Sequence, residues 1–160
     1  MNTYEYTSLL ELIQNNTLNI NNIEEIKNQY IKLLSFLTNV QQMSNEDFII
    51  KINEISKIGT IIICYTYNLK ENKIIIIGTG TIIYEPKIIH GCKYVGHIED
   101  IVVDNIYRSN GIAKNILNKL VDTAKTKNCY KVILDCSNDV LIFYEKIGFE
   151  LHGNQMSKYF

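Results

Sequence analysis

Residues 96–114, Gly-His-Ile-Glu-Asp-Ile-Val-Val-Asp-Asn-Ile-Tyr-Arg-Ser-Asn-Gly-Ile-Ala-Lys, decide how this 160-residue chain folds. An acidic pair leads into an apolar strand, a short polar turn follows, and residues 108–113 open an amphipathic helix. Backbone N–H groups gather at such a helix N-terminus, together with the positive end of the helix dipole. The stretch therefore predicts a strand–turn–helix unit that can hold phosphate oxygens beside two carboxylates.

The turn at residues 108–113 does not match the common phosphate motifs. It lacks the glycines of Gly-x-Gly-x-x-Gly, and it also lacks the Gly-x-x-x-x-Gly-Lys-Ser/Thr pattern of a Walker loop. Small residues at the start of a helix also occur in ordinary turns, so this second interpretation stays open. The strand before the turn and the helix after it favour a phosphate site.

The acidic pair is Glu99-Asp100. Neighbouring strand residues point to opposite faces of a sheet, so both carboxylates can serve one site only at a bulge or a strand end. Solvated charges at a strand end are the alternative. Against that alternative, an unpaired carboxylate within an apolar run is costly.

A third candidate group lies near residues 131–144. The continuous apolar run at 131–134 predicts a buried strand, and Asp135 ends it. A carboxylate at the carboxyl end of a buried strand lies where ligands enter open α/β sheets. Tyr144 on the following helix could reach the same crevice and give a proton to a leaving group, although a tyrosine on an amphipathic helix is often a core residue.

The rest of the pattern predicts one α/β (α+β) domain over residues 1–160, with a divergent segment at 1–25. Residues 1–20 are compatible with a strand or a helix. The apolar stripe Ile23, Ile26, Tyr30, Leu33, Leu34 and Leu37 predicts a helix, and Ser44 with Asp47 predicts the N-cap of a second one.

From Gly59 onward the sequence becomes β-rich. We expect a mixed, mostly antiparallel sheet flanked by helices, with a β-α-β-α-β C-terminal half. The expected elements are strands at 60–67 and 73–84 joined by a hairpin loop at 68–72, a strand at 94–103, a helix at 111–127, a strand at 131–134, a helix at 139–147 ended by Gly148, and a strand near 149–159.

Composition excludes several classes of function. The formal net charge of -1 argues against a nucleic-acid partner. The longest aliphatic run, residues 74–77, is too short to span a membrane, and the N-terminus lacks the features of a secretory signal, so we expect a cytoplasmic protein. Cys64, Cys92, Cys129 and Cys136 have neither CxxC nor zinc-ligand spacing, so we expect reduced thiols and no metal site.

Two motifs resemble the GNAT superfamily of acetyl-CoA-dependent N-acetyltransferases. Residues 108–113 match its R/Q-x-x-G-x-G/A pyrophosphate turn, and residues 143–149 match its late helix-to-strand signature. A narrower resemblance, to the glucosamine-6-phosphate N-acetyltransferases, covers about residues 30–160. It rests on Gly-His-Ile-Glu-Asp-Ile-Val-Val at 96–103 and Cys-Tyr-Lys-Val-Ile-Leu-Asp-Cys at 129–136, with 37–38, 44–48 and 87–90 in support.

The resemblance implies acetyl transfer from acetyl-CoA to the amine of glucosamine 6-phosphate by direct attack in a ternary complex, as a step in UDP-N-acetylglucosamine biosynthesis. It also implies a homodimer that shares some site residues between subunits. The implied catalytic residues are Tyr144, Asp135 and Glu99. The implied acetyl-CoA contacts are Ile101, Val102, Val103, Arg108, Ser109, Asn110, Gly111, Ile112, Ala113, Lys114, Asn138 and Tyr144. The implied sugar-phosphate contacts are Thr38, Lys87, His90, Glu99, Asp100, Tyr130, Lys131, Asp135 and Lys158.

Two positions depart from the family pattern. Val140 stands where the family has Asn, four residues before Tyr144, and Tyr159 stands where it has a basic residue. Two alternatives therefore remain: a GNAT enzyme with another amine acceptor, such as a polyamine or a protein N-terminus, and a catalytically silent acyl-CoA-binding or interaction module. The basic residues Lys87 and Lys131 beside the acidic pair favour a phosphorylated aminosugar over a polycation.

Overall fold

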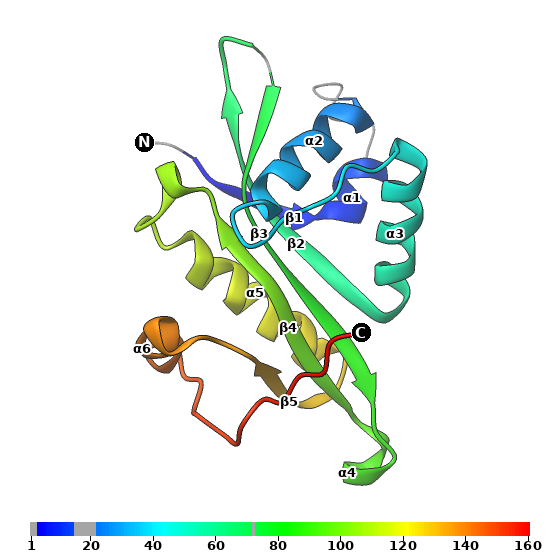
Figure 1. Ribbon diagram of the computed structural model, residues 1–160, viewed down its shortest axis with the longest axis vertical. Coiled ribbons are helices and arrows are strands. Elements are labelled where there is room, and N and C mark those ends of the chain that lie inside the picture. Colours follow the sequence, from blue (N-terminus) through cyan, green and yellow to red (C-terminus); the bar gives the residue numbers. More distant parts are fainter. Residues whose placement is uncertain (1–2, 15–21, 72) are drawn as a thin grey trace.

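The computed structural model describes residues 3–14, 22–71 and 73–160. Within them, one sheet has the strand order β1-β2-β3-β4-β5 (Figure 1). The strands are β1 (Glu5–Ser8), β2 (Gly59–Asn68), β3 (Lys73–Pro86), β4 (Tyr94–Val103) and β5 (Cys129–Leu134). The helices are α1 (Leu9–Gln14), α2 (Ile23–Leu34), α3 (Asn45–Ile58), α4 (Ile89–Cys92), α5 (Ile112–Thr126) and α6 (Leu141–Glu145), with 3₁₀ turns at η1 (Asn105–Tyr107) and η2 (Asn138–Val140).

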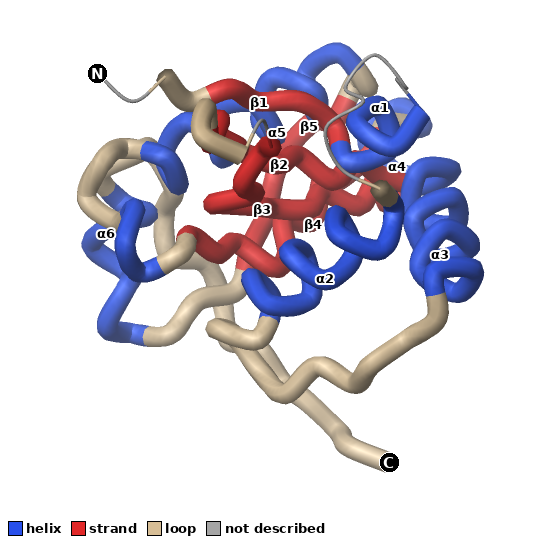
Figure 2. Tube along the Cα trace, turned by 90° about the horizontal axis from the view of Figure 1, so that it is seen from above, coloured by secondary structure: helices blue, strands red, loops and turns tan. Residues whose placement is uncertain are grey.

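Successive side chains of each strand point to opposite faces of the sheet, so helices pack on both faces and the fold has three layers. On one face, which we call the α2 face, Ile61 and Ile63 of β2 pack in a core with Tyr30 and Leu33 of α2 and with residues of α1 and α3. On the opposite face, which we call the α5 face, neighbouring strand residues pack against Ile116, Leu117 and Leu120 of α5. Figure 2 shows helices on both sides of the strands.

The pairing directions confirm the expected mixed sheet. β1, β2, β3 and β4 pair antiparallel in sequence, whereas β4 and β5 pair parallel. A parallel pair requires a long crossover, which α5 supplies. β5 is the edge strand and is only half-buried, so the expected burial of 131–134 is wrong: α5 covers one face of the strand, and its outer edge has no strand partner in the described part of the chain.

Local signals near the N-terminus fix the first helices. Residues 1–20, whose sequence was compatible with a strand or a helix, contain both β1 and α1, and residues 1–2 and 15–20 lie outside the described part. Ser44 caps α3 as expected, since its Oγ accepts a hydrogen bond from the Asp47 N–H at 3.0 Å. α2 ends at Leu34, so Leu37 lies beyond the helix.

The chain after β5 differs from the expectation. The helix expected at 139–147 is divided into η2 and α6, and Gly148 (φ 94°) closes it with Phe149 N–H donating to the Tyr144 carbonyl at 3.1 Å. The strand expected near 149–159 is wrong: residues 149–160 form neither helix nor strand, because within one chain this segment pairs with no strand. Phe149 is half-buried, but the large apolar side chains beyond it are exposed, and Figure 2 places the C-terminus away from the layers.

A Gly59→Ala variant is expected to lose about 2–3 kcal/mol of unfolding free energy. Gly59 begins β2 opposite Ile83, and a Cβ there would overlap the backbone carbonyl oxygen of Ile82, which cannot move without breaking the ladder. Gly91→Ala is the control: a Cβ meets no atom within 4 Å, so only the left-handed backbone (φ 70°) costs about 1 kcal/mol. Chemical denaturation measures both, and equal losses would contradict the steric argument.

Candidate active site

A β-bulge in β4 brings the acidic pair to one place. Thr79 pairs with Val102 and Thr81 pairs with Glu99, so β4 carries one more residue than β3 between these pairs. Asp100 lies in the bulge with left-handed backbone (φ 54°). Gly80 opposes the bulge, where a Cβ would overlap the Ile101 side chain. The irregularity that two adjacent functional carboxylates require is therefore present.

Glu99 and Asp100 lie close enough for the negative charge of Asp100 to act on Glu99. Both side chains reach solvent, yet surrounding protein raises the pKa of Glu99, and the charges of Asp100 and then Asp135 raise it further. Burial also raises the pKa of Asp100. Asp135, which follows the last residue of β5, is thus near enough to Glu99 for its charge to act on the Glu99 carboxyl.

Beside the bulge, one edge of β4 is free. The parallel ladder with β5 runs from Tyr94 to Ile98 and stops there, so residues 99–103 have no strand partner on that side in the described chain. Backbone groups of Ile101, Val102 and Val103 can therefore bind an extended ligand arm. Arg108 borders this edge, since its Nε–H donates to the Val103 carbonyl at 3.3 Å.

The turn before α5 leaves the helix N-terminus open. Ser109 (φ 64°) and Gly111 (φ 75°) both have left-handed backbone, and no side chain caps the helix in the described structure. Asn110 holds the turn by donating from Nδ2 to the Tyr107 and Arg108 carbonyls at 3.0 and 3.1 Å. The N–H groups of residues 112–114 therefore face outward as an anion site on a fifteen-residue helix.

Tyr144 of α6 is the candidate acid. Its ring packs edge-on against Phe143 and Phe149, with centroids 5.1 and 6.0 Å away. Burial raises the pKa of Tyr144, and the nearby Cys136 raises it further, so the phenol keeps its proton at neutral pH. The sequence pattern did not predict the approach of Cys136, because the fold of the loop after β5 creates it.

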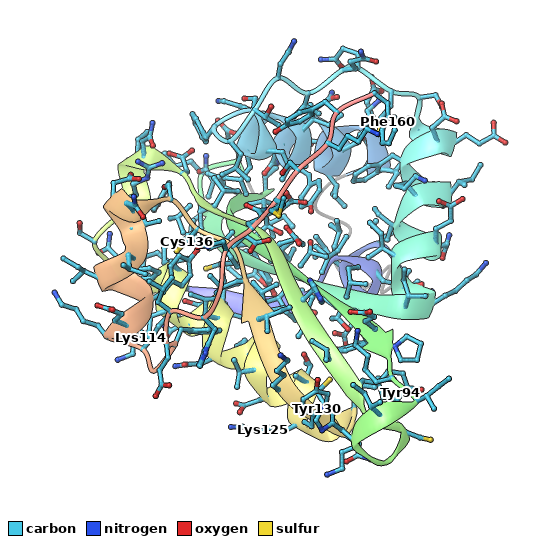
Figure 3. The ribbon with its side chains drawn as sticks, turned by 60° about the horizontal axis from the view of Figure 1, so that its bottom comes forward. Tyr94, Lys114, Lys125, Tyr130, Cys136 and Phe160 are labelled. Atoms are coloured by element: carbon cyan, nitrogen blue, oxygen red, sulfur yellow. The ribbon has the colours of Figure 1, made fainter. Side chains whose placement is uncertain are left out.

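The other predicted sugar-phosphate residues form a second group. The rings of His90 and Tyr130 stack with centroids 4.2 Å apart, and Lys131 Nζ lies 5.7 Å from the Tyr130 centroid. Figure 3 shows Tyr130 close to Tyr94, with Cys136 at the other end of β5. Tyr130 precedes Asp135 by five residues, which corresponds to about 16 Å of strand. Within one chain, the structure therefore does not bring this group to Glu99.

Three predicted residues have individual environments. Lys87 forms an ion pair with Glu85 of the same chain. Thr38 lies in the exposed loop after α2. Lys158 lies on the exposed C-terminal segment, where its Nζ is 5.8 Å from the Phe160 ring centroid.

The described part of the chain contains no helix both long and apolar enough to cross a bilayer.

An acetyl-CoA-type ligand fits this arrangement: an open helix N-terminus for phosphates, a free strand edge for an extended arm, and a protonated phenol nearby. The model of the Acetyltransferase (GNAT) family matches residues 36–149, and the chain belongs to this family. GNAT acetyltransferases use acetyl-CoA. The fold and the predicted family membership are thereby confirmed.

Within the family, the relatives are more specific. The chain is 38% identical to glucosamine 6-phosphate N-acetyltransferase of Arabidopsis thaliana over 86% of this chain and 92% of the relative. It is 37% identical to the enzyme of the same name from Candida albicans over 84% and 89%. The crystal structure of the Arabidopsis enzyme superposes with a TM-score of 0.81 at 33% identity, covering 99% of both chains.

Proposed function

We propose that this protein transfers the acetyl group of acetyl-CoA to the amine of glucosamine 6-phosphate, producing N-acetylglucosamine 6-phosphate. The observation that carries the proposal is the bulge at Asp100, which sets Glu99 and Asp100 beside the free edge of β4 and the open N-terminus of α5. Relatives that bear the name of this enzyme support it. We further propose a cytoplasmic location and a role in UDP-N-acetylglucosamine synthesis.

In this proposal, most of the rate enhancement comes from holding acetyl-CoA and the amine in position. The N–H groups of residues 112–114 and the turn at Ser109 hold the pyrophosphate, while the edge at Ile101–Val103 aligns the pantetheine arm. Fixing two reactants in a reactive geometry can remove roughly 7–11 kcal/mol of the barrier. An aminosugar amine is partly neutral near pH 7, so a strong base is not required.

Each charge that develops has a candidate partner. Glu99 and Asp135 orient the amine, and Glu99 takes its proton directly or through water. A backbone N–H near Val102 stabilises the oxyanion. Tyr144 gives its proton to the departing thiolate, which its raised pKa permits because the phenol is protonated at neutral pH.

A homodimer unites the two groups of candidate residues. The stacked His90–Tyr130 pair and Lys131 lie at the tip near α4, too far from Glu99 of the same chain for one hexose phosphate to contact both. Exposed Ile88 and Ile89 at that tip, and the apolar C-terminal segment with Lys158, provide surface for a second copy. We propose that one subunit binds the amine and its partner binds the phosphate.

Mixed dimers of two inactive variants are expected to recover activity. If Glu99→Gln and Lys131→Ala each remove one half of a shared site, a mixed dimer holds one intact site, and an equal mixture recovers about a quarter of the wild-type rate. The variants are co-expressed and assayed against each variant alone. Failure to recover activity in a verified mixed dimer would contradict the shared site.

Product analysis tests the proposed reaction. Purified protein is incubated with acetyl-CoA and glucosamine 6-phosphate, and the sugar is identified by mass spectrometry and NMR. The proposal predicts one acetyl group on the nitrogen and one free CoA thiol for each sugar acetylated. Thiol release with acetate as the only product would contradict it.

A further inference from the structure

His97 lies on the strand that carries Glu99, and its side chain is on the same face of the sheet. The two residues are separated by one position, so their side chains both point to the α2 face, with backbones about 7 Å apart. In the ladders, His97 pairs with Ile83 of β3 and Ile133 of β5. The imidazole therefore stands between the two apolar neighbours, in line with the carboxylate of Glu99.

The position of the His97 ring is fixed from β3. His97 Nε2 lies 3.2 Å from Glu85 Oε2, and the other carboxylate oxygen of Glu85 binds Lys87. These contacts form a chain Lys87–Glu85–His97 across the sheet. Among the described residues, no hydrogen bond reaches His97 Nδ1, so this nitrogen is available on the side away from Glu85.

We propose that His97, held by Glu85 on the sheet face that carries Glu99, is a positioning residue for Glu99: the protonated imidazole favours the ionised carboxylate of Glu99 beside Asp100 and Asp135, and this form of Glu99 receives the amine. This inference rests on the proposed function, in which Glu99 acts on the amine. His97 itself touches no reacting atom.

The charges around Glu99 are consistent with this role for His97. Burial, Asp100 and Asp135 raise the pKa of Glu99, whereas the charge of His97 lowers it. The other titratable groups near the imidazole are paired with another charge, directed elsewhere or neutral. Lys87 is paired with Glu85, Lys131 of β5 lies over the Tyr130 ring, and burial raises the pKa of Tyr30 on α2 to about 12, so that its phenol is neutral.

The pH dependence of a His97→Gln variant tests the proposal. At the acid pH where a carboxyl titrates, an imidazole normally carries its proton, so its removal deletes a positive charge near Glu99. We expect the acid limb of kcat/KM for glucosamine 6-phosphate to move up by about 0.5 pH unit. In the protein without substrate, the ¹³C signal of the Glu99 side-chain carboxyl should show the same shift of its titration midpoint.

The carboxyl titration separates failure of this inference from failure of the proposed function. If no sugar is acetylated, the ¹³C midpoint still tests whether His97 acts on Glu99. His152→Gln is the matched control, because His152 also pairs with a glutamate, Glu150, at 3.6 Å, and it should leave the midpoint of Glu99 unchanged.

A double-mutant cycle tests the part assigned to Glu85. If Glu85 holds the imidazole, His97→Gln should shift the midpoint of Glu99 less in a Glu85→Gln background than in the wild type. Equal midpoints for wild type and a folded His97→Gln variant would overturn the proposal. Equal shifts in the two backgrounds would overturn the role of Glu85.

Discussion

Replacing Glu99 with Gln is expected to lower kcat/KM for glucosamine 6-phosphate by at least about 100-fold, while the protein unfolds at a higher temperature than wild type at pH 7.5. The loss of activity follows because glutamine cannot accept the amine proton. The gain in stability follows because the folded chain raises the pKa of Glu99 above its ordinary value of 4.5.

The sign of the pH effect follows from proton binding. Between the unfolded and the folded pKa of Glu99, the native state binds more protons than the unfolded state, so stability falls as pH rises through this interval. The glutamine side chain of the variant does not titrate, so the difference in Tm between variant and wild type should disappear well below pH 4.5, where Glu99 is protonated in both states.

Steady-state kinetics at pH 7.5, and thermal melts at pH 7.5 and well below pH 4.5, check this prediction. Glu24→Gln, which removes the same charge from the exposed side of α2, is the control and should retain activity. Wild-type turnover in Glu99→Gln would remove Glu99 from the chemistry. A lower Tm at pH 7.5 would mean that the carboxylate stabilises the fold instead of straining it.

Replacing Tyr144 with Phe is expected to lower kcat by roughly 10²–10³-fold with little change in either KM. The phenylalanine ring keeps the edge-on contacts with Phe143 and Phe149, so folding and binding persist while the proton for the thiolate is lost. Because burial raises the pKa of Tyr144, the wild-type kcat should decline only in alkaline solution, where the phenol ionises.

Steady-state kinetics against both substrates, with a thermal melt, measure this effect. Tyr67→Phe removes a hydroxyl from a tyrosine of β2 outside the candidate site and serves as the control. An unchanged kcat in a folded Tyr144→Phe variant would exclude Tyr144 as the acid. A large rise in KM with kcat intact would assign it to binding.

Local signals predicted much of the fold from the sequence. The Ser44 cap, the turn before α5 and the left-handed Gly148 each depend on a few neighbouring residues, so the pattern was sufficient. The burial of β5 and the final strand were predicted wrongly, because both depend on what covers or pairs with a segment. A run of apolar residues does not indicate which helix covers it or which strand pairs with it.

The same distinction holds for the candidate site. Strand alternation alone predicted that Glu99 and Asp100 can serve one site only at a bulge or a strand end, and the register of β3 and β4 has a bulge there. The Glu85–His97 pair could not be predicted, because it depends on strand register and pairing across the sheet. The separation of Tyr130 from Asp135, in contrast, follows from their five-residue spacing along one strand. The proposal that a second subunit supplies the phosphate contacts rests on that separation together with the shared homodimer site that the resemblance implies.

Initial rates of CoA thiol release with different amines test the central claim most directly. Glucosamine 6-phosphate, glucosamine and spermidine are compared under identical conditions with acetyl-CoA. Charge-assisted phosphate contacts contribute about 1.5–3 kcal/mol each, so two of them predict a kcat/KM at least about 100-fold higher for glucosamine 6-phosphate than for glucosamine. Equal rates with glucosamine, preference for spermidine, or no release with any amine would contradict the account.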